Sequence, residues 1–142
     1  MSNRPKSSLD TNILVGACLG SYAANRILAA CLQRRLTPLI GAALLAEYED
    51  VAGRDEVFVS GRLNRSERNE VLDALLSVCE WTQIYYLWRP NLPDEGDNHI
   101  LELAVVGQAD FVVTRNIQDF NRAQLLFPSV QICPETLLEE LK

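Results

Sequence analysis

Three carboxylates in this sequence occupy positions where an ionised side chain is unusual. Asp10 directly follows the first predicted strand, Glu47 points with the apolar stripe of a predicted helix, and Asp97 heads the apolar stripe of another. An ionised side chain on an inward face is costly unless it is paired or bound to metal. Carboxylates packed together raise one another's pKa unless cations neutralise them, and all-oxygen sites select hard ions. The pattern therefore predicts a site for Mg²⁺ or Mn²⁺.

Each of these acids, taken alone, also has a purely structural interpretation. Asp10 can be a helix N-cap, and Glu47 can pair with a buried arginine. Asp97 can lie in the first turn of a helix that Asp94 caps, where acids favour the helix dipole. Glu102, further along that helix, is expected to face away from the apolar stripe. These interpretations stay open, and the metal site is favoured because the three acids converge on one edge of the predicted fold.

Further polar residues follow a late strand. Thr114, Asn116 and Asp119 come after the short apolar run 111–113, which is typical of a strand buried in a parallel sheet. In such sheets ligands collect beyond the carboxyl ends of the strands. We therefore expect these side chains at the same edge as Asp10, whereas Asp110, which precedes the run, should lie at the opposite end.

Strand-like and helix-like segments alternate along the chain, which predicts an α/β fold with a central parallel sheet and helices on both faces. The first strand is expected to end at Leu9, and the others to cover residues 37–40, 81–86, 111–113 and 130–132. Helices are expected over residues 12–19, 21–36, 42–54, 66–79 with Ser66 as the N-cap, 97–106, and from Pro134 onward.

Length and composition predict one globular domain over residues 1–142, with residues 1–6 as a flexible extension. Apolar residues make up 48% of the chain, which is enough for one core, and no apolar stretch approaches the ~20 residues that span a bilayer. The polar N-terminus lacks the apolar run of a signal peptide, so a cytoplasmic protein without membrane contact is expected. The four scattered cysteines argue against a zinc, CxxC or disulfide framework.

The net charge of −6 argues against simple electrostatic attraction to nucleic acid. Bound divalent cations would reverse the local field, so an acidic protein can still bind phosphates through metal. The single histidine, His99, cannot supply the acid and base pair of a metal-free ribonuclease. Five arginines are candidates for phosphate contacts, with solvated surface charge or pairing with a partner protein as the alternative: Arg62, Arg65, Arg68, Arg115 and Arg122.

Four fragments of the sequence carry a family resemblance by their order and spacing. They are Leu9-Asp10-Thr11-Asn12, Leu45-Ala46-Glu47-Tyr48-Glu49, Pro93-Asp94-Glu95-Gly96-Asp97-Asn98 and Ala109-Asp110-Phe111-Val112-Val113-Thr114-Arg115-Asn116. Together they resemble the PIN-domain family, and most of all its VapC-like toxins of bacterial toxin–antitoxin pairs. The resemblance covers nearly the whole chain and implies a PIN-like three-layer α/β sandwich.

The resemblance also implies an activity, that of a Mg²⁺- or Mn²⁺-dependent endoribonuclease. It matches Asp10, Glu47 and Asp97 to the acidic metal-binding positions of the family. A fourth acid usually follows the late strand, where this chain has Asn116. Asparagine offers a carbonyl oxygen but no negative charge, so Asp119 is a further candidate metal ligand.

Other roles follow from the same resemblance. Thr11, Asn12, Asp94 and Thr114 are candidates for holding the carboxylates in place, and Arg115 for contacting RNA. The implied partners are an RNA substrate, a cognate antitoxin protein and a second copy of the chain in a homodimer. The polar segment 6–8 departs from the family, in which the first strand is usually apolar.

Two alternative functions compete with the ribonuclease. A PIN-like domain that has lost catalysis and serves as a binding module is supported by Asn116. A phosphoacceptor or phosphatase built around Asp10 is disfavoured, because lysine occurs only at Lys6 and Lys142 and Asn12 stands where a phosphatase usually has a second aspartate.

Overall fold

The computed structural model describes residues 4–83, 98–115 and 130–141. In these residues, five short parallel strands form a sheet in the order β3-β2-β1-β4-β5. The strands are β1 (Lys6–Leu9), β2 (Thr37–Ile40), β3 (Glu80–Trp81), β4 (Phe111–Val113) and β5 (Val130–Ile132). All their carboxyl ends lie at one edge, which is where the sequence predicts the functional side chains.

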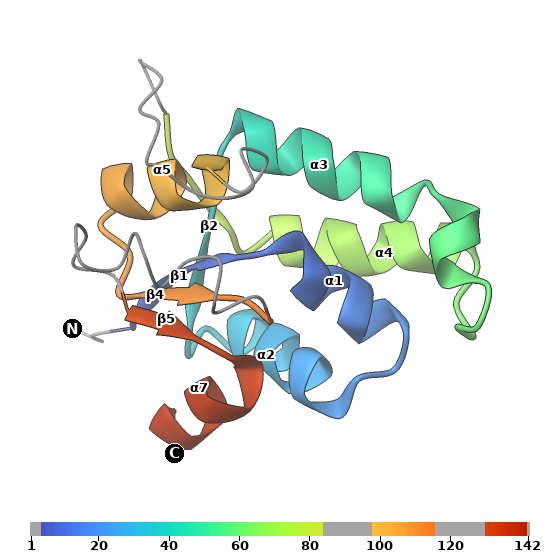
Figure 1. The fold of residues 1–142 in the computed structure, drawn as a ribbon, viewed down its shortest axis with the longest axis horizontal. Helices are drawn as coiled ribbons and strands as arrows, with labels where there is room; N and C mark the ends of the chain where they lie inside the picture. Colours follow the sequence, from blue (N-terminus) through green and yellow to red (C-terminus); the bar gives the residue numbers. More distant parts are fainter. Residues whose placement is uncertain (1–3, 84–97, 116–129, 142) are drawn as a thin grey trace.

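The helices form layers on the two faces of this sheet. They are α1 (Thr11–Cys18), α2 (Tyr22–Leu32), α3 (Ala42–Ala52), the 3₁₀ turn η1 (Asp55–Phe58), α4 (Arg65–Leu76), α5 (Asn98–Val106) and α7 (Pro134–Glu140). Figure 1 shows α5 on one side of β1, β4 and β5, and α2 and α7 on the other. The predicted α/β sandwich with a central parallel sheet is confirmed.

Strand β1 is central in the sheet although its sequence is polar. Ser7 and Ser8 are fully buried, and Ser8 Oγ donates to the carbonyl oxygen of Ile100 in α5 at 3.3 Å. Small side chains let α5 lie directly on the strand, so packing explains this departure from an apolar strand. The strand begins at Lys6, inside the segment predicted as an extension, where its partner across the sheet is Thr37.

Most helix boundaries differ from the prediction by a few residues, and the structure gives a clear cause for two of the differences. Helix α2 ends at Leu32 rather than at residue 36, because Arg34 adopts a left-handed conformation with φ of 61°. Arg35 N then donates to Ala30 O at 2.9 Å and Arg34 N to Cys31 O at 3.0 Å, which is a Schellman turn. Such a turn usually carries glycine at the left-handed position, so the sequence gives no warning of it.

Helix α4 begins earlier than predicted, and Ser66 is not its N-cap. Asn64 caps it: Asn64 Oδ1 accepts from Glu67 N at 2.8 Å, and Glu67 Oε1 accepts from Asn64 N at 2.9 Å. This reciprocal pair is a capping box. The predicted strand 81–86 begins one residue earlier, as β3 is Glu80–Trp81. Residues 82 and 83 are not part of it, and residues 84–86 lie outside the described part of the chain.

Two global properties complete the fold. Among the described residues no single helix is long and apolar enough to cross a membrane; α1 and α2 reach the required length and composition only as a pair, which is bent by 108°. The four cysteines are free, with Cys18 and Cys31 buried and Cys79 and Cys133 half-buried. Burial raises the pKa of Cys31 and of Cys79 to about 12, so both stay protonated at neutral pH.

Candidate functional site

Asp10 lies at the carboxyl edge of the sheet, where β1 ends beside β4. Its backbone N–H donates to the carbonyl oxygen of Val113 at 2.9 Å, which extends the pairing of the two strands by one residue. Its carboxylate is buried, and Oδ2 accepts from Thr114 Oγ1 at 2.7 Å and from Asn12 Nδ2 at 3.2 Å. Groups that lie far apart in the sequence therefore hold this carboxylate in one orientation.

Asp10 also occupies the N-cap position of α1, with φ of −60° and ψ of 149°. An N-cap carboxylate normally accepts from the free N–H groups of the first turn. Within the described residues its side chain makes no such bond, and only its backbone carbonyl accepts, from Ile13 N at 2.9 Å. Side-chain capping therefore does not account for Asp10, whose carboxylate is directed to Thr114 instead.

Glu47 reaches the same edge from α3. Its side chain is half-buried and accepts a hydrogen bond from Thr11 Oγ1, next to Asp10 in the chain. The sequence predicts Glu47 within the apolar stripe of its helix, but the fully buried positions include Leu44 and Tyr48, and Glu47 lies at their margin. Helix α1 packs against α3, and the hydrogen bond between Thr11 and Glu47 joins them. The carboxylates of Asp10 and Glu47 therefore lie at the same edge of the sheet.

Tyr48 supports this edge from within the core, a role that the sequence analysis missed. Its hydroxyl donates to the carbonyl oxygen of Leu9 at 2.6 Å, immediately before Asp10. Burial, with smaller contributions from Cys79 and Asp10, raises the pKa of Tyr48 well above its ordinary value, so the hydroxyl stays protonated and keeps donating. A buried aromatic residue directly after Glu47 is the signal that could have revealed it.

Four residues of the predicted site lie outside the described residues. They are the candidate ligands Asp97, Asn116 and Asp119, and Asp94, which is predicted to support the carboxylates. In the part of the chain that the structure describes, no three His, Cys, Asp or Glu side chains are grouped so that they could hold a metal ion. Asp97, Asn116 and Asp119 therefore stay predicted ligands of the metal.

Glu102 does not behave as predicted. It was expected to face away from the apolar stripe, but its side chain is only 2% exposed. The expectation is wrong because α5 contacts three strands of the sheet and also α3, so more than one of its sides is covered. The nearly continuous apolar sequence from Ile100 to Val106 was the signal for burial on several sides.

The donor atoms at the edge fit a hard divalent cation. Asp10 and Glu47 contribute carboxylates, and Asn12 contributes an amide carbonyl, so the set consists of oxygen atoms. Asn12 Oδ1 is buried and has no hydrogen-bond partner among the described residues. Buried acceptors are normally satisfied, so this oxygen is available to a cation or to a donor that accompanies one.

A family model described as PIN domain matches residues 7–118. The chain belongs to the PIN domain family. The matched region contains Asp10, Glu47, Asp97 and Asn116, whereas Asp119 and the last strand and helix lie beyond it. None of the curated proteins matches the chain.

The fold of this PIN domain is also similar to a solved structure. A chain in the crystal structure of VapBC2 from Rickettsia felis, bound to a DNA fragment from their promoter, superimposes with a TM-score of 0.59. The match covers 90% of this chain and 98% of that chain, at 20% sequence identity. At this identity the likeness concerns the fold.

The arginines of the PIN domain are engaged to different degrees. Arg68 is 3% exposed and cannot contact RNA, which corrects its candidacy. Arg115 is partly exposed, and its Nη1 donates to both carboxylate oxygens of Glu135 at 2.6 Å while Nη2 lies 3.4 Å from Ser21 Oγ. The hydrogen bond from Arg115 lowers the pKa of Glu135. Arg115 thus ties the segment after β4 to the first turns of α2 and α7.

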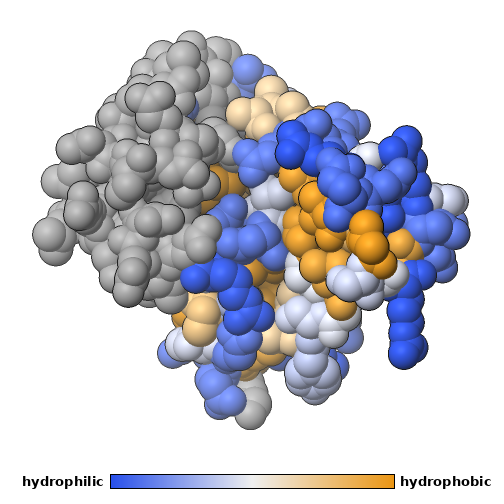
Figure 2. Space-filling view, turned by 45° about the vertical axis from the view of Figure 1, so that its right-hand side comes forward, coloured by the Kyte–Doolittle hydropathy of each residue, from blue (hydrophilic) through white to orange (hydrophobic). Residues whose placement is uncertain are grey.

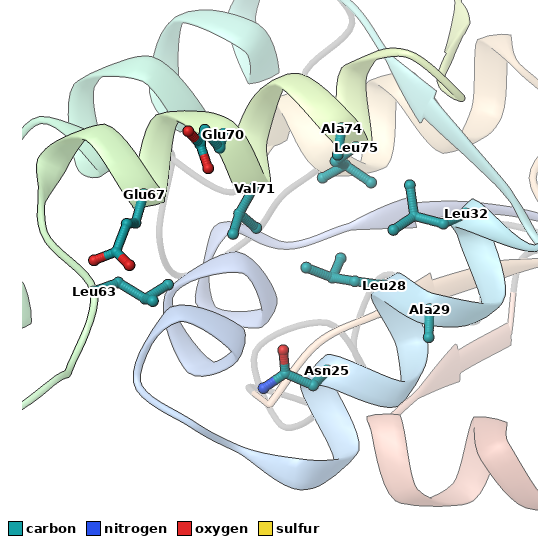
Figure 3. A pocket seen from close by; sticks show the side chains of 10 residues that line it. All are labelled: Asn25, Leu28, Ala29, Leu32, Leu63, Glu67, Glu70, Val71, Ala74 and Leu75. Carbon is teal, nitrogen blue, oxygen red and sulfur yellow. The ribbon is translucent and has the colours of Figure 1, made fainter.

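The PIN domain also has an apolar groove of about 430 Å³ between α2 and α4. Figure 3 shows Leu28 and Leu32 of α2 opposite Val71 and Leu75 of α4. The side of the molecule brought forward in Figure 2 has exposed apolar surface bordered by hydrophilic side chains. The described lining does not include Asp10 or any of its hydrogen-bond partners, so the groove is separate from the carboxylate edge.

Proposed function

We propose that this PIN domain is a metal-dependent endoribonuclease and the toxin of a toxin–antitoxin pair. The observation that carries the proposal is the buried carboxylate of Asp10, held by Thr114 and Asn12 at the carboxyl edge of the sheet. A buried carboxylate that does not cap its helix, and whose neighbour in the chain bonds to a second carboxylate, is typical of a functional site.

Mg²⁺ or Mn²⁺ would be held by Asp10 and Asp97, with Asn116 or Asp119 completing the set. When bound, such an ion supplies Lewis acidity that lowers the pKa of a water and stabilises negative charge on the phosphate. The chain itself fixes the ligands: Thr114 and Asn12 orient Asp10, and Tyr48 anchors the end of β1. Preorientation of this kind lowers the cost of binding the ion.

Glu47 is assigned to the attacking water. Its carboxylate, oriented by Thr11, accepts a hydrogen bond from that water and directs its oxygen at the phosphorus. The bond from the water oxygen to phosphorus forms in line with the bond to the 3′ oxygen that breaks. The water loses one proton to solvent by way of Glu47, and the leaving 3′ oxygen takes up one proton from solvent. The products are a 3′-hydroxyl and a 5′-phosphate. Arg115 would contact a neighbouring phosphate of the RNA by exchanging its ion pair with Glu135 for that phosphate.

An antitoxin would occupy the groove between α2 and α4. Its apolar floor suits the apolar face of an amphipathic helix, and Glu67 and Glu70 of α4 lie along its wall. With a net charge of −6 on the chain, the complementary helix would carry lysine or arginine on that side. The fold similarity to a chain of the VapBC2 complex supports an antitoxin as the partner.

The nuclease is tested by incubating a panel of single-stranded RNAs with the purified chain in Mg²⁺, in Mn²⁺ and in EDTA. Asp10→Asn and Glu47→Gln should each lower the cleavage rate by about 100-fold or more, the scale of losing an acid–base or electrostatic group. Glu49→Gln is the matched control, because Glu49 is an exposed acid on the same helix. Equal cleavage by all variants would reveal a contaminating ribonuclease and contradict the proposal.

Absence of cleavage by the folded wild type, with Mn²⁺ bound, would favour the binding module instead. The toxin role is tested separately by inducing the wild type and Asp10→Asn in bacteria, where only the wild type should arrest growth. The product of the adjoining gene, if it is the antitoxin, should relieve that arrest. Glu70→Lys should weaken its binding, whereas Glu49→Lys, which makes the same charge change outside the groove, should not.

A further inference from the structure

We infer that Asn12 is a further residue of the metal site, whose side-chain carbonyl oxygen takes part in binding the divalent cation. The inference rests on the proposed function, because it assigns this oxygen to the same ion that Asp10 binds. It concerns a neutral residue in the first turn of α1, which the sequence presents only as a support for the carboxylates.

The orientation of the Asn12 amide is determined by its neighbour. Nδ2 lies 3.2 Å from Asp10 Oδ2 and donates to it. The reversed orientation would bring the amide oxygen against a carboxylate oxygen, where neither atom can donate a hydrogen bond. Oδ1 is therefore the end of the amide that is directed away from this contact.

Oδ1 is buried and has no hydrogen-bond partner among the described residues. A buried amide oxygen without a partner has lost its hydrogen bonds to water and gained none in return. This loss lowers the stability of the folded chain. Most buried polar atoms in proteins are satisfied, so an exception beside a carboxylate calls for a ligand. Cations of the Mg²⁺ and Ca²⁺ type accept amide carbonyl oxygens together with carboxylates.

Support of Asp10 alone does not require an asparagine. Thr114 already donates to the same Oδ2 over the shorter distance of 2.7 Å. A serine at position 12 offers a hydroxyl donor and buries no carbonyl oxygen. The amide differs in adding a neutral oxygen ligand, which strengthens cation binding without adding a negative charge next to Asp10 and Glu47.

The test measures Mn²⁺ affinity of the whole chain by isothermal titration calorimetry, with the electron paramagnetic resonance signal of free Mn²⁺ as a second readout. Asn12→Ala should weaken binding by about 10-fold or more, the usual cost of losing a group that supports a metal site. Thr114→Val removes one hydrogen-bond donor to Asp10 and leaves the Asn12 carbonyl in place. This variant should therefore lose less Mn²⁺ affinity than Asn12→Ala does. Asn12→Asp keeps an oxygen at this position and should bind Mn²⁺ at least as tightly as the wild type.

Each outcome decides between the inference and the proposed function. If Asn12→Ala binds Mn²⁺ as well as Thr114→Val does, or if Asn12→Asp loses as much as Asn12→Ala, the carbonyl has no role and the inference is wrong. If the wild type binds no Mn²⁺, or binds it as tightly as Asp10→Asn does, the proposed metal site itself is wrong. Asn12→Leu, which has nearly the shape of asparagine and no oxygen in its side chain, replaces Asn12→Ala if that variant does not fold, and should show the same loss of Mn²⁺ affinity.

Discussion

Asp10 and Arg68 are both almost fully buried charged side chains, and their surroundings differ. Every nitrogen of the Arg68 guanidinium donates: Nε to Ala52 O at 3.0 Å, Nη1 to Leu63 O at 3.2 Å, and Nη2 to the carboxylate of Asp55. The guanidinium also lies 4.4 Å from the centroid of the Phe58 ring. All of these partners come from the short stretch that runs from the last residue of α3 to the start of α4.

Asp10, in contrast, has a local partner in Asn12 and further partners in a distant segment. Thr114 is 104 residues away, and the backbone bond to Val113 joins it to the same strand end. Next to it, Asn12 Oδ1 remains without a partner among the described residues. A buried charge whose donors are all used locally stabilises a loop, whereas a buried carboxylate at a junction of elements, beside an unsatisfied acceptor, indicates a site.

The largest expected effect on stability follows from this contrast and concerns Arg68. Arg68→Met should lower the free energy of unfolding by about 2–4 kcal/mol, because it leaves the carbonyl oxygens of Ala52 and Leu63 without their donor and removes the contact with Phe58. Urea denaturation followed by circular dichroism measures the change. Mn²⁺ affinity should not change, since Arg68 is assigned no part in the site.

Arg62→Met is the matched control, because Arg62 is exposed on the same segment and its loss should change stability by no more than about 0.5 kcal/mol. If Arg68→Met kept its stability but lost Mn²⁺ affinity, Arg68 would belong to the metal site and would not be a structural residue of the loop.

The sequence analysis wrongly included Arg68 among the candidate RNA-binding arginines, and the reason is physical. Three arginines near the start of a helix resemble a solvated, phosphate-binding face, and charge patterning alone cannot separate the buried one from its neighbours. Helical spacing can, because Arg68 shares a face with Leu72 and Leu75, both of which are buried. The argument that favoured Glu47 and Asp97 would therefore also have singled out Arg68.

The sheet and the order of its elements were predictable because the alternation of apolar strands and amphipathic helices is a local property. Asp10 could be singled out because it directly follows a strand. Its contact with Thr114 depends on the register in which Leu9 pairs with Val113 across the sheet, and no local pattern encodes that register. The bond between Thr11 and Glu47 depends in the same way on how α1 packs against α3.

A smaller effect is expected at Tyr48, on the side of the carboxylate edge. Tyr48→Phe should lower the free energy of unfolding by about 1–2 kcal/mol, because the buried carbonyl oxygen of Leu9 loses its donor. The raised pKa of Tyr48 contributes stability that is present below about pH 10, its ordinary value, and is lost as the pH rises further. Urea denaturation should be measured from about pH 8 to about pH 11, a range that brackets the ordinary pKa of tyrosine. The free energy of unfolding should fall less steeply with rising pH for Tyr48→Phe than for the wild type. An identical decline would mean that Tyr48 titrates as in the unfolded chain.

The smallest effect is expected at Asp55, the partner of Arg68, and appears only in acid. The hydrogen bond from Arg68 lowers the pKa of Asp55 below its ordinary value of 3.8. A carboxyl group whose pKa is lower in the folded chain than in the unfolded chain stabilises the fold at pH values above its pKa in the unfolded chain. This stabilisation is lost as the pH falls through its pKa in the folded chain. Asp55→Asn should therefore be less stable than the wild type at neutral pH, and the difference should shrink below a pH of about 4. Glu56→Gln, an exposed neighbour, should show no such convergence. If Asp55→Asn instead stayed equally far below the wild type at every pH, the charge of Asp55 would contribute nothing, and its carboxyl group would stabilise Arg68 through a hydrogen bond that persists when the group is protonated.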